Sequence, residues 1–574
     1  MSPVLKKQLQ SCALGRGEPD FVLKNATVAD VFSEKLFRAD VAVKSGFIAG
    51  VGSYSAAREI NLTGKTVVPG FIDAHMHLES SMACPSILAP KLLARGTTAV
   101  VADPHEIANV CGLEGVRYLM RDSAKTPLDV YFALPACVPL GPLDHNGAVF
   151  GVEEMKKLRF HPRVCGLGEV MNFTAAAGGD DGLLKKIELM QHGTIDGHSP
   201  GMAGRALQAY RLSGVQTDHE CSSWPEALER LRAGFIVQIR EGSAAKNLRA
   251  IVSGILRDGV ACDRFVFCTD DVHLDDVEQN GHIDRNIRMA IALGMEPVRA
   301  VKIATLNAAR AYGFRDRGAV APGYRADLVV LDDLAEVHIR QVYKGGVPLQ
   351  DLPGNRRRTR AGARLTHSVH IPALKADAFA LRASGDFPVI GIVPGQLATE
   401  KLMLPLPERG GLFRPAGGLL KIAVVQRHDG TGRVGVGAVK GLGLRNGAVA
   451  STVGHDAHNL IVAGDSDGDM LAAVEELKRC GGGYTLVSGG RVLKTVRLNI
   501  AGLFTDRAEP DVSREIAEMA AAAHRLGVPE NIDIFQDLSF LSLPVIPALR
   551  ITDSGVFDVR AGRYLTGTSG RKIG

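Results

Sequence analysis

The stretch Val67–Glu79 (VVPGFIDAHMHLE) decides the fold and points to the site. Its apolar run predicts a buried strand, with a turn at Pro69-Gly70. The strand ends in His75 and His77, and side chains at positions i and i+2 of a strand face the same side. The two imidazoles can therefore bind one metal ion. A His-x-His pair on a surface strand is common and inert, but the buried run before this one favours the metal hypothesis.

Composition and charge describe a globular protein of several domains. The chain has 574 residues, of which 46% are hydrophobic and 22% charged, which predicts two to four domains. A net charge of +5 is too small to predict nucleic acid binding. Nine cysteines without a C-x-x-C pair indicate reduced thiols. No apolar run approaches a membrane span and no secretory leader is evident, so we expect a cytoplasmic protein without membrane contact.

Strand–helix alternation over residues 69–315 predicts a metal-binding barrel of the (β/α)8 type, an α/β fold. Residues 1–68 and 316–365 have the texture of short strands, and we expect them to form one small β-sandwich domain. Residues 353–360 are rich in arginine and are interpreted as an exposed linker rather than a phosphate contact. Barrel strands are expected at 98–102, 129–134, 164–169, 193–197, 235–239 and 264–270, with helices at 224–233 and 244–258.

Residues 366–574 are expected to form a C-terminal mixed α/β domain, with strands at 389–393 and 419–426 and a helix at 511–526. Our hypothesis is that this domain covers the barrel mouth as a lid. His455 and His458 lie in this domain, and we interpret them as residues of an exposed loop.

Four further side chains lie where predicted barrel strands end: Glu169, His198, His219 and Asp270. Barrel enzymes place their active sites at the carboxyl ends of the strands. Each residue alone has another explanation: a loop histidine, a surface acid or a helix N-cap. Six candidates in order, counting the first histidine pair, predict a metal site.

Nitrogen and oxygen donors without a thiolate suit Zn²⁺, Fe²⁺ or Mn²⁺. Six ligands exceed one tetrahedral site, so two ions bridged by a carboxylate, roughly 3.5–4 Å apart, are expected. Such a centre lowers the pKa of a coordinated water to about 7 and supplies a hydroxide nucleophile.

The segment 69–77 (PGFIDAHMH) resembles the first-strand signature of the amidohydrolase superfamily, and the later candidates fall in that superfamily's order. Within it the chain is most similar to the bacterial adenine deaminase family. The stretches that carry this resemblance are 101–106, 168–172, 196–198, 217–220, 269–272, 453–459 and 540–547.

The resemblance implies hydrolytic deamination of a small purine base, adenine, to hypoxanthine and ammonia. It also implies two divalent metal ions per chain, Mn²⁺ or Fe²⁺ before Zn²⁺, and we expect a homodimer. The implied ligands are His75, His77 and Asp270 for one ion, His198 and His219 for the other, and Glu169 as the bridge.

Two acids are expected to handle protons. The resemblance implies that Asp270 accepts the proton of the attacking water and passes it to the departing amine, a role worth roughly 10²–10⁴-fold in rate. Asp271 is a second candidate for this role, or for orienting a ligand histidine. Asp103, His105 and Glu106 form another cluster, which either contacts substrate, binds an accessory metal, or serves as a loop cap or supporting ion pair.

Two other functions stay open at this stage. On the same fold, an N-acetyl sugar deacetylase or a cyclic amide hydrolase would use a similar centre, although cyclic amide hydrolases usually bridge their metals with a carbamylated lysine rather than a glutamate. A metal-free, non-catalytic scaffold is the third hypothesis.

Overall fold

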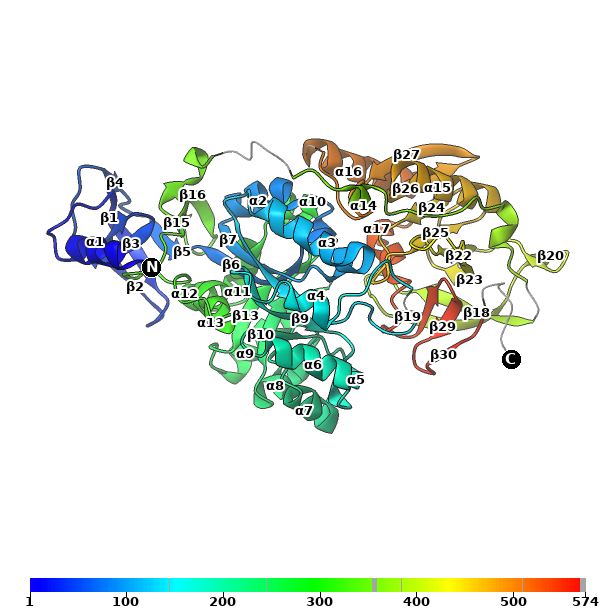
Figure 1. Ribbon diagram of the computed structural model, residues 1–574, viewed down its shortest axis with the longest axis horizontal. Helices are drawn as coiled ribbons and strands as arrows, with labels where there is room; N and C mark the ends of the chain where they lie inside the picture. The colour runs from blue at the N-terminus through cyan, green and yellow to red at the C-terminus, as the bar shows by residue number, and fades with distance from the viewer. Residues whose placement is uncertain (144, 244, 354–358, 383–384, 508, 568–574) are drawn as a thin grey trace.

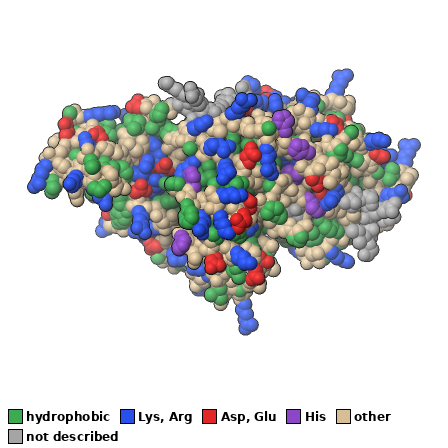
Figure 2. All heavy atoms as spheres, in the orientation of Figure 1, with side chains coloured by type: hydrophobic (Ala, Val, Ile, Leu, Met, Phe, Trp, Pro, Cys, Tyr) green, Lys and Arg blue, Asp and Glu red, His purple; other side chains and the backbone are tan. Residues whose placement is uncertain are grey.

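The computed structural model describes residues 1–143, 145–243, 245–353, 359–382, 385–507 and 509–567. Three parts follow one another along the long axis of the molecule: an N-terminal β-sheet, a central barrel and a C-terminal α/β part (Figure 1). Lys and Arg side chains are interspersed with Asp and Glu over the visible face (Figure 2). Among the described residues, no helix has both the length and the apolar character needed to cross a membrane.

The barrel is assembled from two parallel sheets. One has the order β10-β9-β8-β7-β6-β14 and the other β11-β12-β13. They join at two places: β13 continues into β14 after Thr269, and Gln216 N donates to Ile195 O at 2.9 Å between β10 and β11. The predicted (β/α)8-type fold is confirmed. The strands are β6 (Phe71–His77), β7 (Thr97–Ala102), β8 (Asp129–Leu134), β9 (Val164–Val170), β10 (Thr194–Gly197), β11 (Thr217–Asp218), β12 (Ile236–Arg240), β13 (Phe265–Cys268) and β14 (Asp270–Asp271).

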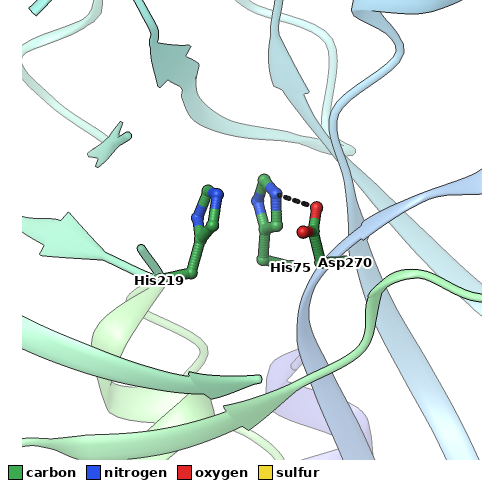
Figure 3. A group of neighbouring side chains, drawn as sticks. All are labelled: His75, His219 and Asp270. Atoms are coloured by element: carbon green, nitrogen blue, oxygen red, sulfur yellow. Dashed lines mark ion pairs between the residues drawn. The ribbon is translucent and has the colours of Figure 1, made fainter. Parts of the chain in front are cut away.

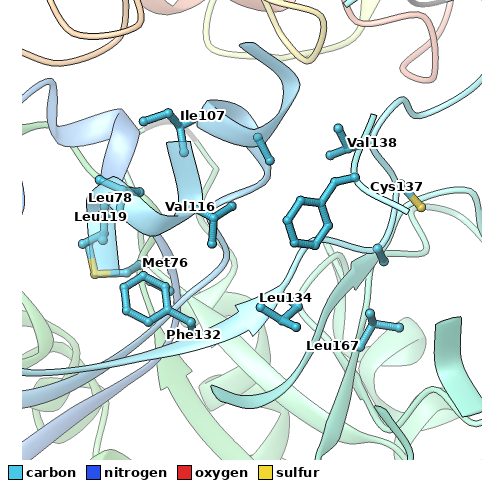
Figure 4. Close-up of a cluster of buried hydrophobic side chains, with 14 of the residues drawn as sticks. Met76, Leu78, Ile107, Val116, Leu119, Phe132, Leu134, Cys137, Val138 and Leu167 are labelled. Atoms are coloured by element: carbon cyan, nitrogen blue, oxygen red, sulfur yellow. The ribbon is translucent and has the colours of Figure 1, made fainter. Parts of the chain in front are cut away.

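Helices cover the outside of the barrel and exclude water from its strands. Met76 of β6, Leu119 of α3 and Phe132 of β8 belong to one fully buried cluster between strands and helix (Figure 4). Burying a side chain such as Phe132 contributes about 1.5–3 kcal/mol. The helices are α2 (Pro85–Ala94), α3 (His105–Ser123), α4 (Val152–Lys156), α5 (Phe173–Ala177), α6 (Asp181–Met190), α7 (Gly204–Leu212), α8 (Trp224–Arg232), α9 (Leu248–Asp258), α10 (Leu274–Asn280), α11 (Ile283–Ala292), α12 (Pro297–Lys302) and α13 (Ala308–Ala311).

Helix α9 begins at Leu248, so the predicted helix is wrong at residues 245–247, and residue 244, where it was predicted to begin, lies outside the described residues. The reason is the side chain of Asn247, which accepts a hydrogen bond from Arg240 N at 2.7 Å. Its amide nitrogen donates to the carbonyls of His219 and Cys221 at 3.1 and 2.9 Å. These bonds hold Asn247 against the ends of two barrel strands, which delays the first helical turn.

The N-terminal sheet combines strands from before and after the barrel, in the order β17-β16-β15-β5-β1-β2-β3, with β4 paired to β1. The junction is antiparallel, with Leu328 of β15 opposite Pro69 of β5. Helix α1 (Pro3–Ala13), which the sequence did not suggest, packs on this sheet. The strands are β1 (Phe21–Asp30), β2 (Lys35–Lys44), β3 (Phe47–Gly52), β4 (Glu59–Asn61), β5 (Thr66–Pro69), β15 (Leu328–Asp333), β16 (His338–Lys344) and β17 (Val347–Pro348).

An ion-pair cluster ties this sheet to the barrel. Asp129 of β8 accepts from Lys344 of β16 at 2.6 Å and from Arg317 at 2.7 Å. Burial would raise the pKa of the Asp129 carboxyl, but the charges of Lys344 and Arg317 hold that pKa well below its usual range.

The largest sheet of the C-terminal part has the order β19-β18-β23-β22-β25-β24-β26-β27. Alternate residues of β22 face opposite sides: Ile422 and Val424 share a buried cluster with α16 and α17, whereas Ala423 and Val425 share one with α15. The elements are β18 (Asp386–Ile392), β19 (Thr399–Pro405), β22 (Leu419–Val425), β23 (Val434–Lys440), β24 (Ala448–Ser451), β25 (Leu460–Gly464), α15 (Asp467–Cys480), β26 (Gly483–Ser488), β27 (Arg491–Arg497), α16 (Glu509–Arg525) and α17 (Ile534–Phe540).

Most of the predicted linker, residues 354–358, lies outside the described residues. At its described end Thr359 is buried, and its N–H donates to Asp122 Oδ1 at 3.1 Å. The prediction of an exposed linker is therefore wrong at this position, because the backbone docks on helix α3.

Candidate active site

Strand β6 delivers His75 and His77 into the barrel, and both side chains are buried. His77 Nδ1 lies 3.1 Å from the carbonyl oxygen of Asp103. Since a carbonyl only accepts, this contact places the proton on Nδ1 and leaves Nε2 free as a donor to a metal. His77 Nε2 points at Glu169 Oε1 and Asp270 Oδ1, each 3.0 Å away.

Glu169, at the end of β9, divides its two carboxylate oxygens between two groups of histidines. Oε1 lies 3.0 Å from His77 Nε2 and 3.9 Å from His75 Nε2. Oε2 lies 2.7 Å from His198 Nδ1 and 3.4 Å from His219 Nε2. This arrangement is the one required of a carboxylate that bridges two metal ions.

Asp270, in β14, completes the first group. Its Oδ1 lies 3.0 Å from His77 Nε2 and 3.5 Å from His75 Nε2, whereas Oδ2 accepts from Arg240 at 2.6 Å. Burial would raise the pKa of the Asp270 carboxyl, but the charge of Arg240 and the nearby imidazoles of His75 and His77 hold that pKa well below its usual range. Asp270 is therefore an anion with one oxygen turned to the histidines.

The rings of His75 and His219 stack at 4.5 Å between centroids and 19° between planes, beside Asp270 (Figure 3). Among the described residues, neither ring nitrogen of His75 has a hydrogen-bond partner, and neither does His219 Nδ1. Buried polar atoms without a partner are rare in native proteins and call for an ion or a water. These orphaned nitrogens, in a set of imidazoles and carboxylates, fit a metal centre.

The six residues predicted as metal ligands thus come together from five strands or strand ends. Combinations of them meet within 4.8 Å: His75, His219 and Asp270; His75, His77 and Glu169; and Glu169, His198 and His219.

Asp73 anchors the strand ends that carry two of these residues. Its carboxylate accepts from the backbone N–H of His75 at 3.2 Å and from the hydroxyl of Thr269 at 2.5 Å. It therefore links β6 to the residue that precedes Asp270, whose φ of +61° is a conformation that non-glycine residues rarely adopt.

The other predicted site residues surround this centre. Asp103 accepts from the backbone N–H of Glu169 at 2.8 Å, so it orients the bridging carboxylate as well as His77. His105 Nδ1 lies 3.6 Å from Glu169 Oε1. Asp271 is half-buried and accepts a hydrogen bond from the hydroxyl of Ser80. Glu106 meets His77 and His105 within 4.8 Å, and its carboxylate also reaches His455 and His458 of the C-terminal part.

A cavity of about 710 Å³ lies over the centre. Its barrel wall includes His77, Glu169, His219 and Asp270, and its opposite wall comes from the C-terminal part: Leu397, His455, Asp456, Phe540, Leu543 and Ile546. The ring of His455 stacks on Phe540 at 4.3 Å and 18°.

The interpretation of His455 and His458 as members of an exposed loop is wrong, because both side chains are buried. Their segment folds back onto the barrel, where His455 Nδ1 lies 3.3 Å from Glu106 Oε1. Burial of the imidazole against the barrel lowers the pKa of His455.

Sequence reasoning missed two charged residues of the centre. Arg240, the last residue of β12, pairs through one nitrogen with Glu220 and Asp270, at 2.6 Å each. Glu220 Oε1 also lies 3.4 Å from His219 Nε2. Both stand at strand ends, so the rule that found the other candidates could have found them. Asp456 carries no such signal, because its place depends on the docking of a distant segment.

Comparisons with known proteins agree with this geometry. Residues 66–352 match the amidohydrolase family, and residues 396–563 match the adenine deaminase C-terminal domain. The chain therefore belongs to the metal-dependent hydrolases of the amidohydrolase superfamily.

Its relatives define the family within that superfamily. An adenine deaminase from Nitratidesulfovibrio vulgaris is 47% identical over 98% of this chain and 99% of its own length. Another, from Desulfitobacterium hafniense, is 44% identical over 97% of this chain and 98% of its own. The chain is a member of the adenine deaminase family. A solved adenine deaminase structure shares 19% identity and a TM-score of 0.43 over 58% of this chain and 99% of its own, which is too distant to add to the argument.

Proposed function

We propose that this site hydrolyses adenine to hypoxanthine and ammonia on two divalent metal ions. The observation that carries the proposal is Glu169, whose two oxygens face two separate histidine groups beneath a cavity. Membership in the adenine deaminase family over nearly the whole chain supports the substrate.

The proposed ligands form two groups, one facing each oxygen of the Glu169 carboxylate. One ion would be held by His75, His77 and Asp270, the other by His198 and His219, with Glu169 shared. All donors are nitrogen or oxygen, which suits Mn²⁺ or Fe²⁺, with Zn²⁺ as the alternative. When bound, the ions lower the pKa of a coordinated water to about 7 and supply the hydroxide that attacks C6 of the purine.

Asp270 is the proposed proton carrier. Its anionic carboxylate can accept the proton of the attacking water and deliver it to the departing amine. Arg240 holds Oδ2 at 2.6 Å, which fixes the carboxylate plane while Oδ1 stays on the side of the histidines. Asp271 lies next along the chain and lines the same cavity, so it remains the second candidate for proton handling.

The purine plane would lie against the apolar wall that the C-terminal part supplies. Phe540, Leu543 and Ile546 line the cavity opposite the bridging Glu169 side of the barrel. An aromatic ring offers stacking to any purine, so the polar edges of the cavity must select adenine. His105 and Asp456, whose Nε2 and Oδ1 atoms lie 3.9 Å apart, stand on that edge.

We also propose a homodimer. The hairpin of β1 and β2 carries three large apolar residues, Phe32, Leu36 and Phe37, that are 43–49% exposed to solvent. Light scattering after size exclusion tests the dimer, and a monomer at micromolar concentration would contradict it.

The function is tested by the fall in ultraviolet absorbance as adenine is converted, using enzyme stripped of metal and reloaded with Mn²⁺, Fe²⁺ or Zn²⁺. Metal-dependent formation of hypoxanthine supports the proposal. Two bound ions without turnover would redirect the assignment to an amide or N-acetyl substrate on the same centre.

A further inference from the structure

A second group of metal-binding side chains lies between the barrel and the C-terminal part. Glu106 comes from the first turn of α3, and His455 and His458 come from the segment that joins β24 to β25. All three side chains are buried. His455 Nδ1 lies 3.3 Å from Glu106 Oε1, and His458 Nε2 lies 3.9 Å from Glu106 Oε2. One possible ligand atom from each residue lies within 4.8 Å of the ligand atoms of the other two.

The hydrogen-bond pattern leaves this group incomplete without a further atom. His458 is fully buried, and neither of its ring nitrogens has a hydrogen-bond partner among the described residues. The ionic contacts of Glu106 within the described part of the chain are these two histidines, with no Lys or Arg at salt-bridge distance. Among the described residues, the buried imidazole of His458 thus lacks a hydrogen-bond partner, and the Glu106 carboxylate that it faces lacks a Lys or Arg partner. Such an arrangement needs an explanation.

The segment that carries the histidines is held in place independently of them. Arg427 is fully buried and donates to the carbonyl oxygens of His458, Thr452 and Ala501. Asn459 accepts from Arg427 N at 3.1 Å and donates to His145 O at 3.0 Å. Because the backbone is fixed on both sides, the two rings are positioned before any ligand binds, as a metal site requires.

We propose that Glu106, His455 and His458 bind a third divalent metal ion, separate from the two of the catalytic centre, and that this ion fastens the C-terminal part to the barrel. Two imidazoles and one carboxylate form a three-residue set suited to Zn²⁺, with donor distances of about 2.0–2.2 Å. His455 Nδ1 and His458 Nε2 lie 3.3 and 3.9 Å from the two oxygens of Glu106, close enough for an ion between them to bind all three side chains. Asp456 lies beside this group: its Oδ1 is 3.8 Å from His455 Nδ1, and its buried Oδ2 has no hydrogen-bond partner among the described residues.

The third ion would lie in the wall of the cavity, because Glu106 and His455 both line it. His455 and Asp456 line the wall that faces the catalytic centre, so an ion on the same segment fixes that wall relative to α3. None of the six proposed catalytic ligands belongs to the new set, which makes the two sites separable by mutation.

The test is the metal content of the full chain, loaded with Zn²⁺ alone, dialysed and measured by mass spectrometry. We expect about three ions per chain in the unaltered protein and about two in Glu106→Gln and His458→Gln. His338→Gln is the matched control, because His338 is exposed on the N-terminal sheet. This variant should retain about three ions per chain. Unaltered protein that retains only two ions, or variants that retain three, would overturn the proposal.

Two further measurements separate the third site from the catalytic centre and cover the case of a variant that does not fold. The double variant His75→Asn/His219→Asn should lose turnover and the catalytic ions and keep one, whereas loss of every ion would contradict a separate site. If His458→Gln does not fold, anomalous scattering from crystals of the zinc-loaded unaltered protein decides the matter. A peak between Glu106, His455 and His458 supports the site, and its absence beside full peaks at the catalytic centre refutes it.

Discussion

Replacing Arg240 by methionine removes the one cation that pairs directly with Asp270 among the described residues. The side chain is buried and sits 2.6 Å from both Asp270 Oδ2 and Glu220 Oε1. Methionine keeps much of the length of the side chain but leaves two buried carboxylates without their partner. Breaking a buried ion pair from one side costs about 3–5 kcal/mol. At about 2–4 °C per kcal/mol, the midpoint of thermal unfolding should fall by about 6–20 °C.

The size of this fall should depend on metal. Ions at the catalytic centre would restore positive charge next to Asp270, so the loss should be largest in metal-free protein and smaller after reloading. Turnover should fall even in the reloaded variant, because Oδ2 is no longer held and Asp270 loses its orientation. The largest decrease in kcat that we expect is the roughly 10²–10⁴-fold that general acid–base catalysis contributes.

Arg240→Lys is the matched control, since it keeps the charge but lacks the guanidinium fork. It should recover most of the thermal stability and only part of kcat. Differential scanning calorimetry and the absorbance assay measure the two effects on the same preparations. Unaltered stability and turnover in Arg240→Met would refute the view that this ion pair positions Asp270.

Three other predictions follow from the fold and the cavity. Asp129→Asn should lower the unfolding free energy by about 1–3 kcal/mol at pH 7. Because the folded-state pKa of Asp129 is lowered, its contribution is present above pH about 4 and is lost as the pH falls further, so chemical denaturation should show the two proteins converging in acid. Phe132→Ala should cost about 3–5 kcal/mol in the same assay, because the side chain is fully buried in the barrel cluster. Phe540→Ala should raise KM for adenine about 5–150-fold if the ring stacks on the base, at about 1–3 kcal/mol, whereas an unchanged KM would place the purine elsewhere.

The barrel and the positions of the six proposed ligands could be predicted because their signals are local. Glu169, His198, His219 and Asp270 each lie at or just after the carboxyl end of a barrel strand, and parallel strands bring these ends to one face. Arg240 and Glu220 stand at such ends too, and the same rule applies to them, but an arginine is not a metal ligand and its pairing with Glu220 and Asp270 depends on contacts between strands.

The cavity wall could not be predicted, because it depends on contacts between distant segments. His455, Asp456 and Phe540 reach the centre only through the docking of the C-terminal sheet on the barrel. That docking rests on bonds such as the one from Asn459 to His145 O, which join residues 314 positions apart. The late start of helix α9 after Asn247 has a similar origin, since the Asn247 side chain bonds to strand ends that precede it.

The most direct test of the central claim is adenine turnover by metal-free enzyme reloaded with Mn²⁺, Fe²⁺ or Zn²⁺, with Asp270→Asn measured beside the unaltered chain. We expect hypoxanthine to form only after reloading, with two catalytic ions per chain, and the substitution to abolish it. Turnover by enzyme free of metal, or full activity in Asp270→Asn, would contradict the assignment of this centre.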